Sequence, residues 1–446
     1  MKYFSKKALA LFLCVLVVVP LTLCGCKKDT QEIYFLNFKP EQADVYKEIA
    51  NEYEKQTGVK VKVVTAAANG YEQTLKSEIA KSDAPTIFQI NGPIGYNAWK
   101  DYCLDITDSK LYEMLTDKSL AIKSEGRVYG IPFVVESYGI IYNDAIMKKY
   151  FALPNRATSI TDASQINSFD TLKAVVEDMT KHKSELGIDG VFGSTSLAAG
   201  EDWRWQTHLA NLPFYAEFSK AANGQDPTTT GQNLKEIGFE FNENYRKIFD
   251  LYTNNSATQK NLLGSKSVAD SMAEFALGKV AMIQNGTWAY SQIADVKGNT
   301  VKSEDIKMMP IYMGLDNEQN QGLCIGTENY FAINSKVSEE KQKLSLDFLQ
   351  WLFSSDIGKD YVTNKLGFTT PFNTFTAEQT PPDPLARQTA EWLSKPNINS
   401  IPWVFTVFPS DVFKTDFGNA LLLYVQGTSD WETVVKTVKD SWRKER

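Results

Sequence analysis

The sequence predicts an α/β protein that folds into two domains. Short apolar, strand-like runs alternate with amphipathic helical segments near the start of the chain, at 33–36, 59–63 and 86–90. This βαβαβ order is typical of a mainly parallel sheet covered by helices. The chain has 446 residues, which is too long for one compact core, so we expect a second domain built in the same way.

The first 25 residues have the pattern of a secretion signal. Three lysines precede an apolar run at 8–19 that is too short and wrongly flanked for an ordinary membrane span. Gly25 stands directly before Cys26, which resembles the bacterial lipoprotein box, where the signal is cut before a cysteine that then carries lipid. We therefore expect a lipid at Cys26 that anchors the protein to the extracytoplasmic face of the cell membrane. A soluble secreted protein with a free Cys26 is the alternative.

Charge and cysteine content exclude several partner classes. The formal charge is −7, and it becomes −10 without the signal, which holds three lysines and no acid. An acidic exported chain argues against nucleic-acid binding. Beyond the signal and Cys26, only Cys103 and Cys324 remain, and no CxxC spacing is present. The two thiols could pair, but we favour two buried free thiols, and we expect no metal or cofactor.

Polar residues follow the strands of the first expected sheet. Asn37 comes directly after 33–36, an Asn-Gly turn lies within 66–70, and Asn91 follows 86–90. Ligands of open α/β sheets bind beyond the carboxyl ends of the strands, so these residues should line one edge. The two asparagine amides suit sugar hydroxyls, although both residues are also common turn formers without a ligand.

One acid, Glu136, stands within an apolar stretch in the middle of the chain. Apolar residues flank it at 133–135 and 140–141. A carboxylate in such surroundings needs a partner. That partner could be a pair of sugar hydroxyls or an internal lysine or arginine.

The densest cluster of acids and aromatics is the segment 200–205, GEDWRW. On a strand or an extended loop, Trp203 and Trp205 would face the same side. The apolar face of a sugar ring stacks on aromatic rings, so both tryptophans and the adjacent Glu201 are candidate ligand contacts. The alternative is that the tryptophans anchor the helix that we expect at 208–212.

A large aromatic residue also follows an expected buried strand in the second half of the chain. The apolar run 280–283 is followed by Asn285-Gly286 and then by Trp288. This position is suited to lining a cleft, with a core or interface role as the alternative. Trp403 is a further candidate for the cleft, although a core role is the preferred interpretation.

Two segments resemble motifs of the family 1 extracellular solute-binding proteins, the sugar-capturing subunits of bacterial ABC importers. The segment 126–143 resembles a Gly-x-x-Tyr-Gly-x-Pro turn followed by a strand that ends in Tyr-Asn. The segment 274–290 resembles the motif Gly-Lys-x-Ala-Met followed by Gly-x-Trp, on Phe275, Gly278, Lys279, Ala281, Met282, Gly286 and Trp288.

The resemblance implies the two-lobe, type II periplasmic-binding-protein-like fold of maltose-binding-protein-like members. It places 26–137 and 311–360 in the N-terminal lobe, and 138–310 and 361–446 in the C-terminal lobe. A ligand cleft is expected between the lobes.

The resemblance also implies a mechanism. A monomer closes its two lobes on a carbohydrate, with an oligosaccharide favoured by the many aromatic residues, and ABC permease subunits in the membrane then recognise the closed form. The ligand contacts implied are Trp288, Glu136, Glu201, Trp203, Trp205 and Asn91, with Asn37 and Trp403 as further candidates.

The chain lacks the parts of most enzyme classes. Its two histidines, His182 and His208, belong to no HExxH motif, and no P-loop or GxGxxG follows a strand. A glycoside hydrolase needs only two carboxylates, which Glu136 and Glu201 could supply, so that alternative stays open. We nevertheless predict a binding protein rather than an enzyme.

A different cargo is the second alternative. An anionic solute, such as a glycerol phosphate ester, would need arginines or helix N-termini at the cleft. Arg127 and Arg204 are the arginines near the candidate residues. We therefore predict a neutral sugar before other solutes.

Overall fold

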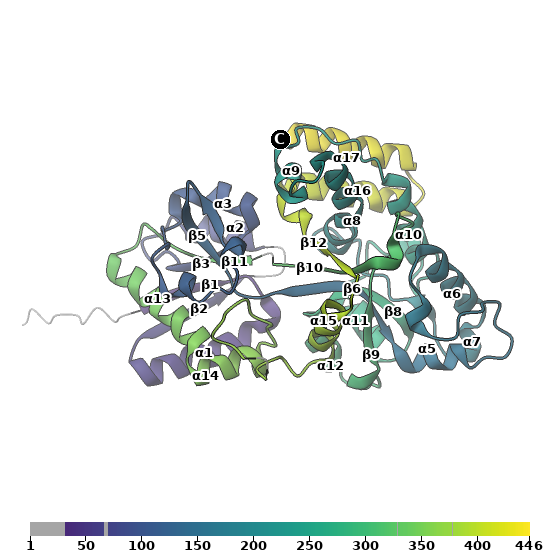
Figure 1. Ribbon diagram of the computed structural model, residues 1–446, viewed down its shortest axis with the longest axis horizontal. Coiled ribbons are helices and arrows are strands. Elements are labelled where there is room, and N and C mark those ends of the chain that lie inside the picture. The colour runs from purple at the N-terminus through teal and green to yellow at the C-terminus, as the bar shows by residue number, and fades with distance from the viewer. Residues whose placement is uncertain (1–31, 67–69, 328, 377) are drawn as a thin grey trace, which may run out of the picture.

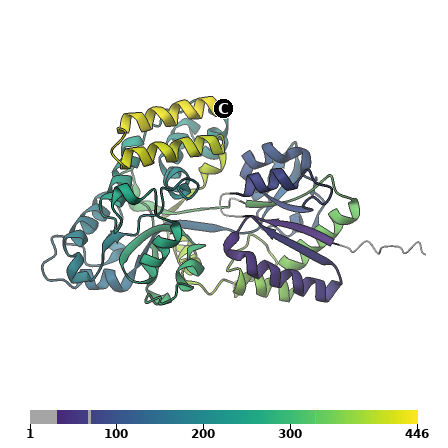
Figure 2. The ribbon, with the colours of Figure 1, turned by 180° about the vertical axis from the view of Figure 1, so that it is seen from behind.

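The computed structural model describes residues 32–66, 70–327, 329–376 and 378–446, which form two lobes (Figures 1 and 2). Each lobe contains a six-stranded sheet with helices packed around it. The predicted two-lobe α/β fold is therefore confirmed. The expected signal and Cys26 lie outside the described residues, as do 67–69 of the expected Asn-Gly turn.

The sheet of the first lobe has the strand order β2-β1-β3-β11-β5-β4. β1 runs parallel to β2 and β3, β11 runs antiparallel to β3 and β5, and β4 runs antiparallel to β5. The strands are β1 (Glu32–Asn37), β2 (Lys60–Thr65), β3 (Ile87–Asn91), β4 (Ile122–Ser124), β5 (Arg127–Pro132) and β11 (Asn329–Ile333).

Helix α1 shows how the sequence sets the elements of this lobe. A 3-10 turn at Pro40–Gln42 leads into it, where proline's missing N–H costs nothing. Gly58 ends it with φ of 75°, and its N–H donates to the carbonyl of Glu54. Ile49 and Tyr53 are buried on its inner stripe. The helices are α1 (Ala43–Thr57), α2 (Tyr71–Glu78), α3 (Gly92–Trp99), α4 (Lys110–Glu113), α13 (Glu339–Ser354) and α14 (Asp356–Asp360).

The sheet of the second lobe has the order β12-β10-β6-β8-β7, with β9 also paired to β6. β6 runs antiparallel to β8, β9 and β10, whereas β7 is parallel to β8 and β12 is parallel to β10. The strands are β6 (Glu136–Asn143), β7 (Gly190–Phe192), β8 (Val280–Gly286), β9 (Ile306–Met309), β10 (Gln321–Gly326) and β12 (Asn399–Pro402).

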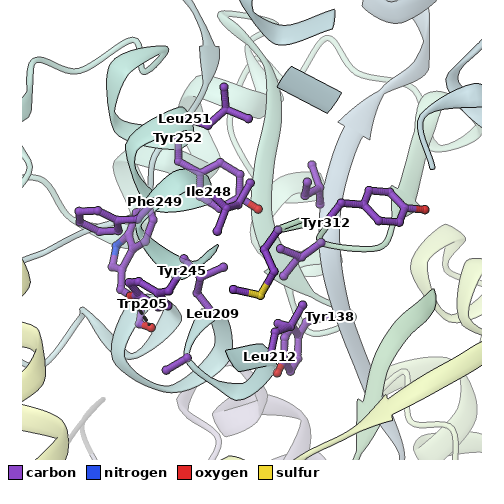
Figure 3. Close-up of a cluster of buried hydrophobic side chains, with 14 of the residues drawn as sticks. Tyr138, Trp205, Leu209, Leu212, Tyr245, Ile248, Phe249, Leu251, Tyr252 and Tyr312 are labelled. Atoms are coloured by element: carbon purple, nitrogen blue, oxygen red, sulfur yellow. Dashed lines mark hydrogen bonds between the residues drawn. The ribbon is translucent and has the colours of Figure 1, made fainter. Parts of the chain in front are cut away.

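A large aromatic core fills the second lobe, and Figure 3 shows Trp205 within it beside Phe249 and Tyr252. The helices around it are α5 (Asp144–Phe151), α6 (Phe169–Lys181), α7 (Lys183–Leu186), α8 (Asn211–Ala222), α9 (Pro227–Asn233), α10 (Asn242–Asn254), α11 (Val268–Ala276), α12 (Ala289–Ala294), α15 (Pro384–Ser394), α16 (Asp411–Val425) and α17 (Trp431–Glu445).

Both sheets are mixed, which corrects the expectation of mainly parallel sheets. The reason is that the chain passes between the lobes more than once. β3 ends at Asn91, whereas β11 begins beside it at Asn329, because β11 enters the first sheet from the other lobe. A strand that begins at the edge where β3 ends must run antiparallel to β3.

Three segments connect the lobes. The long strand β6 leaves the first lobe directly after Val135, which bridges to Thr369, and becomes the centre of the second sheet (Figure 1). β10 pairs with β6 and leads back into β11. The third connection follows Phe372, which bridges to Leu115 of the first lobe, and leads to α15.

Core packing places the lobe boundaries differently from the expected ones. Ile311 and Tyr312 pack in the core of the second lobe, whereas Val362 and Phe368 pack in the core of the first. We therefore propose that the chain changes lobe near Val135, near Gly326 and soon after Phe375, in place of the expected 137/138, 310/311 and 360/361.

Two further expectations concern thiols and membrane spans. Cys103 and Cys324 are free and buried, as favoured, and burial raises the pKa of each to about 12. Of the helices in the described ranges, none combines the length and the apolar character that a membrane span needs.

Candidate ligand-binding site between the lobes

An aromatic cluster of five rings lies on the second lobe where β6, β8 and β10 end or begin. It consists of Tyr138, Trp203, His208, Trp288 and Trp403. His208 stacks on Tyr138 with ring centroids 4.4 Å apart, and Trp288 lies 5.2 Å from His208. Trp203 and Trp403 lie 5.9 and 6.3 Å from Trp288. Trp203 and Trp288 are only partly buried, so their rings are available to a ligand.

Two glycines shape this cluster. A Cβ on Gly286, the last residue of β8, would lie 2.2 Å from the ring of Trp288. A Cβ on Gly326, the last residue of β10, would lie 2.5 Å from the ring of Trp403. Any larger residue would displace these rings. The Gly-x-Trp spacing therefore lets Trp288 fold back against the end of its own strand.

Buried polar atoms without a hydrogen-bond partner occur within the cluster, in residues next to it and on the first-lobe strands. On the second lobe they are Trp288 Nε1, Trp403 Nε1, His208 Nδ1, Arg204 Nη1 and Thr287 Oγ1. The first-lobe strands β3 and β11 add Gln89 Nε2 and Asn329 Oδ1, and Thr327 Oγ1 lies on the connection between β10 and β11. A buried polar group without a partner costs on the order of 1–3 kcal/mol. Ligand hydroxyls between the lobes would supply the missing partners.

Arg204 is the most unusual member of this set. Its side chain is 1 % exposed, and its guanidinium lies 3.7 Å over the ring of Trp203. Nε donates to Asn285 Oδ1 at 3.2 Å. Desolvation lowers the pKa of Arg204 to about 9, against the opposing fields of Glu201 and Glu41.

His208 is neutral for a related reason. It is 2 % exposed, and desolvation together with the positive charge of Arg204 lowers its pKa well below the ordinary value. A neutral imidazole has one donor and one acceptor nitrogen, so its Nδ1 can serve a sugar hydroxyl in either sense.

Glu136 has an internal partner. Its Oε1 accepts a hydrogen bond from Lys39 Nζ at 2.8 Å, and both residues are buried. Lys39 belongs to the turn after β1, and Glu136 is the first residue of the connecting strand β6. The sequence left two kinds of partner open for Glu136, a pair of sugar hydroxyls or an internal lysine or arginine. The structure shows an internal lysine. The pair fixes the start of the connection to the first lobe.

The two asparagines differ. Asn37 is fully buried and uses its amide within the first lobe: Nδ2 donates to the Lys39 carbonyl at 2.7 Å and to Thr65 Oγ1 at 3.1 Å, and Oδ1 accepts from Lys39 N–H. Asn37 therefore stabilises the turn after β1, which was the alternative to a ligand contact. Asn91 ends β3 opposite Asn329, is partly exposed, and stays a predicted ligand contact.

The segment around Glu201 is not the extended stretch that we expected. Trp203 precedes a π-helical segment, Arg204–Leu209, so the two tryptophans diverge. Trp203 joins the aromatic cluster, whereas Trp205 is 1 % exposed and donates its Nε1–H to the carbonyls of the Thr195–Ser196 segment (Figure 3 shows its core position). The prediction of a shared face is wrong.

Glu201 also has a partner inside the second lobe. Its Oε2 accepts a hydrogen bond at 2.6 Å from the N–H of Val268, the first residue of α11. A carboxylate at a helix N-terminus is stabilised by the helix dipole. A structural role for Glu201 is therefore visible, whereas its contact with a ligand stays a prediction.

The family model described as bacterial extracellular solute-binding protein matches residues 48–390, which include parts of both lobes and all three connections. The chain belongs to this family. The resemblance stated from the two sequence motifs is therefore confirmed. The proteins of this family bind solutes for transport.

Curated relatives of this solute-binding protein are distant. It is 25 % identical over 322 residues to the maltooligosaccharide ABC transporter solute-binding lipoprotein of Streptococcus pneumoniae. It is 23 % identical over 302 residues to the maltodextrin-binding protein MdxE of Bacillus subtilis. In both cases the match spans 66 % of this chain and 66 % of the relative, just under two thirds.

Solved structures share the fold over nearly the whole chain. The solute-binding protein RafE in complex with raffinose superimposes with a TM-score of 0.68 at 19 % identity, covering 93 % of this chain and 99 % of RafE. Maltose-bound MalE3 of T. maritima gives 0.65 at 14 % identity, with 93 % and 99 % covered. These likenesses confirm the type II two-lobe fold.

Sequence reasoning missed several residues of the site in this solute-binding protein. Tyr138 and His208 stack on each other in the aromatic cluster, whereas Gln89 and Asn329 lie on β3 and β11 of the first lobe, and no local pattern singled out any of the four. The ends of β3 and β8 did point to Asn91 and Trp288. Within the described ranges, no group of His, Cys, Asp and Glu side chains is arranged to hold a metal ion.

Proposed function

We propose that this solute-binding protein captures a carbohydrate, and preferably an oligosaccharide, for an ABC importer. The observation that carries the proposal is the combination of three tryptophans with buried, unpartnered polar atoms between the lobes. Sugar rings present an apolar face for stacking and hydroxyls around their edge, so they match both features. The names of the relatives, which refer to maltooligosaccharides and maltodextrin, support the same class of cargo.

Each part of the site has a distinct role in this proposal. Trp203 and Trp288 stack on sugar faces, and Trp403 donates its Nε1–H to a hydroxyl. On the opposite lobe, Gln89, Asn91 and Asn329 bond hydroxyls at the other edge of the ligand. We no longer include Asn37 and Trp205 among the contacts, because their polar groups are used within their own lobes.

Lobe closure follows from the three connections. The lobes already touch where α3 meets the 3-10 segment Val404–Val407: a Cβ on Gly92 would lie 3.1 Å from Thr406 Cβ. Rotation about the connections would open and close this contact, as in hinge closure of two-lobe binding proteins. Ligand bound to both faces stabilises the closed form.

Location and partners are part of the proposal. The Gly25-Cys26 pair and the lipoprotein names of relatives support an anchor lipid at Cys26 and a position at the outer face of the cell membrane. Membrane permease subunits then take the sugar from the closed monomer. The relatives' description as ABC transporter components supports this partner.

The hydrolase alternative has little support. Its two candidate carboxylates are both engaged, Glu136 with Lys39 and Glu201 with the N-terminus of α11. A hydrolase needs one acid to protonate the leaving group and a second carboxylate that acts on the sugar or on water. We therefore propose binding without catalysis.

A thermal-shift screen of the purified protein against mono- and oligosaccharides tests this function. A ligand that binds only the folded state raises the melting temperature. We expect a shift with one sugar class and no new reducing ends after incubation. Shifts only with peptides, polyamines or glycerol phosphates would refute the carbohydrate assignment, and new reducing ends would support the hydrolase.

A further inference from the structure

Arg204 is a buried cation that lacks a counter-ion. Its side chain is 1 % exposed, and its guanidinium contacts the Asn285 amide and the ring of Trp203. Nη1 is buried without a partner, and within the described ranges no carboxylate forms an ion pair with this guanidinium. Buried charges in proteins are almost always paired, because desolvation of an unpaired charge is costly.

The nearest acids already serve other groups. Glu201 accepts the N–H of Val268 at 2.6 Å, and Glu41 of the first lobe lies 3.8 Å from Lys39 Nζ. Both act on Arg204 only through their electric fields. Because desolvation outweighs these fields and lowers the pKa of Arg204, the positive charge is only partly compensated.

The neighbours of Arg204 add further donors. Trp203, on which the guanidinium lies, is 5.9 Å from Trp288, and Trp288 is 6.3 Å from Trp403, between ring centroids. The unpartnered Nε1–H groups of Trp288 and Trp403 can only donate, as can Nη1 of Arg204. Three obligate donors suit an acceptor-rich group, and the charged one among them favours an acceptor with a negative charge.

We propose that the carbohydrate carries a carboxylate, as a uronic acid does, and that the guanidinium of Arg204 binds it between the lobes. The inference rests on the proposed carbohydrate-binding function and names a narrower class of ligand. It replaces the expectation of a neutral sugar.

A carboxylate fits better than the other anions. It meets a guanidinium in two parallel hydrogen bonds, as a phosphate can also do, so the carboxylate is preferred for its single charge. Two acids, Glu201 and Glu41, also lie near enough to act on Arg204 through their electric fields. A phosphate ester with nearly two charges would be repelled more strongly than a carboxylate with one.

The test compares each acid with its own methyl ester. Calorimetric titrations of the purified protein would use oligogalacturonates, glucuronoxylo-oligosaccharides, their methyl esters, raffinose and maltotriose. We expect at least one acid to bind about tenfold or more tightly than its ester, because a charged hydrogen bond is lost on esterification. This comparison uses the unchanged chain and does not depend on the folding of a variant.

Variants then assign the preference to Arg204. Arg204→Met should bring the acid-to-ester affinity ratio close to one, and Arg204→Lys should keep part of it. Arg127→Met is the matched control, because Arg127 is exposed and lies at the outer end of β5, where it pairs with Asp105. The acid-to-ester affinity ratio of Arg127→Met should equal that of the unchanged chain.

The outcomes separate the two levels of the proposal. Binding of neutral sugars with no preference for any acid would overturn the inference and keep the carbohydrate function. Preference for galactose 6-phosphate or galactose 6-sulfate over the uronates would overturn the carboxylate assignment. An unchanged acid-to-ester ratio in folded Arg204→Met would remove Arg204 from the recognition. Absence of binding to every sugar would contradict the proposed function itself.

Discussion

The two faces that meet between the lobes differ in chemistry. The second-lobe face is made of large rings, with the buried guanidinium of Arg204 over the ring of Trp203, and its unpartnered atoms are mostly donors. The first-lobe face is made of short amides at the ends of β3 and β11, and the turn after β1 is closed by its own hydrogen bonds. We therefore propose that the second lobe contributes most of the ligand-binding energy and that the first lobe contributes orientation and closure.

The pair Trp203 and Trp205 gives the largest expected effect within this comparison. Trp205→Ala removes a core ring and should lower the free energy of unfolding by about 4 kcal/mol. Denaturant unfolding measures this loss. Trp203→Ala is the matched control two residues away: it should cost far less stability and weaken sugar binding instead. Equal stability losses in both variants would contradict the assignment of one ring to the core and the other to the site.

The ion pair at the start of β6 gives the next effect. Glu136→Gln removes the carboxylate that lies 2.8 Å from the buried ammonium of Lys39, so stability should fall by about 3 kcal/mol. The double variant Lys39→Met/Glu136→Gln should recover much of this loss in the same unfolding measurement. A stability unchanged by Glu136→Gln would show that the pair does not fix the connection to the first lobe.

The second lobe should also carry a pH dependence. Burial raises the pKa of Asp202 from 3.8 to about 6. Between about pH 4 and pH 6 the folded state keeps a proton that the unfolded state releases, so stability falls as pH rises through this window. We expect Asp202→Asn to gain about 2 kcal/mol relative to the unchanged chain from pH 4 to pH 7. Parallel pH profiles of the two proteins would contradict the raised pKa.

The smallest effect belongs to the first lobe. Gln89→Met keeps the side-chain volume but removes the unpartnered Nε2, together with the Oε1 that accepts from Phe38 N–H at 2.5 Å. Sugar affinity should fall about fivefold, or about 1 kcal/mol, and denaturant unfolding separates this effect from the loss of the Phe38 hydrogen bond. Thr287→Val on the second lobe is the comparison variant, because it also removes an unpartnered polar atom, Oγ1. A loss much larger than fivefold for Gln89→Met would reverse the proposed division of binding energy between the lobes.

The sequence could predict the fold class and the elements that end at the interface. The βαβαβ start and the buried strand before Trp288 depend on local patterns, and the structure has them as expected. The mixed sheets could not be predicted, because β11 pairs with β3, which lies more than two hundred residues earlier in the chain. The direction of Trp205 depended on a π-helical segment, for which no local signal was present.

The contacts of polar residues were equally hard to predict. Asn37 and Glu136 looked like ligand contacts because no partner is visible near them in the sequence. The partner of Glu136 is Lys39, ninety-seven residues away, which only the folded chain reveals. In the sequence, Arg204 and Arg127 are equivalent as arginines near the candidate residues. In the structure, Arg204 is buried and Arg127 is exposed.

The central claim is that the aromatic face of the second lobe holds the sugar. The most direct test is a calorimetric titration of the sugar found in the screen into the unchanged protein and into Trp288→Ala, with Trp351→Ala on the first lobe as control. We predict a loss of about 2 kcal/mol, or about thirtyfold in affinity, for Trp288→Ala only. Equal affinity of the unchanged protein and a folded Trp288→Ala would contradict the account.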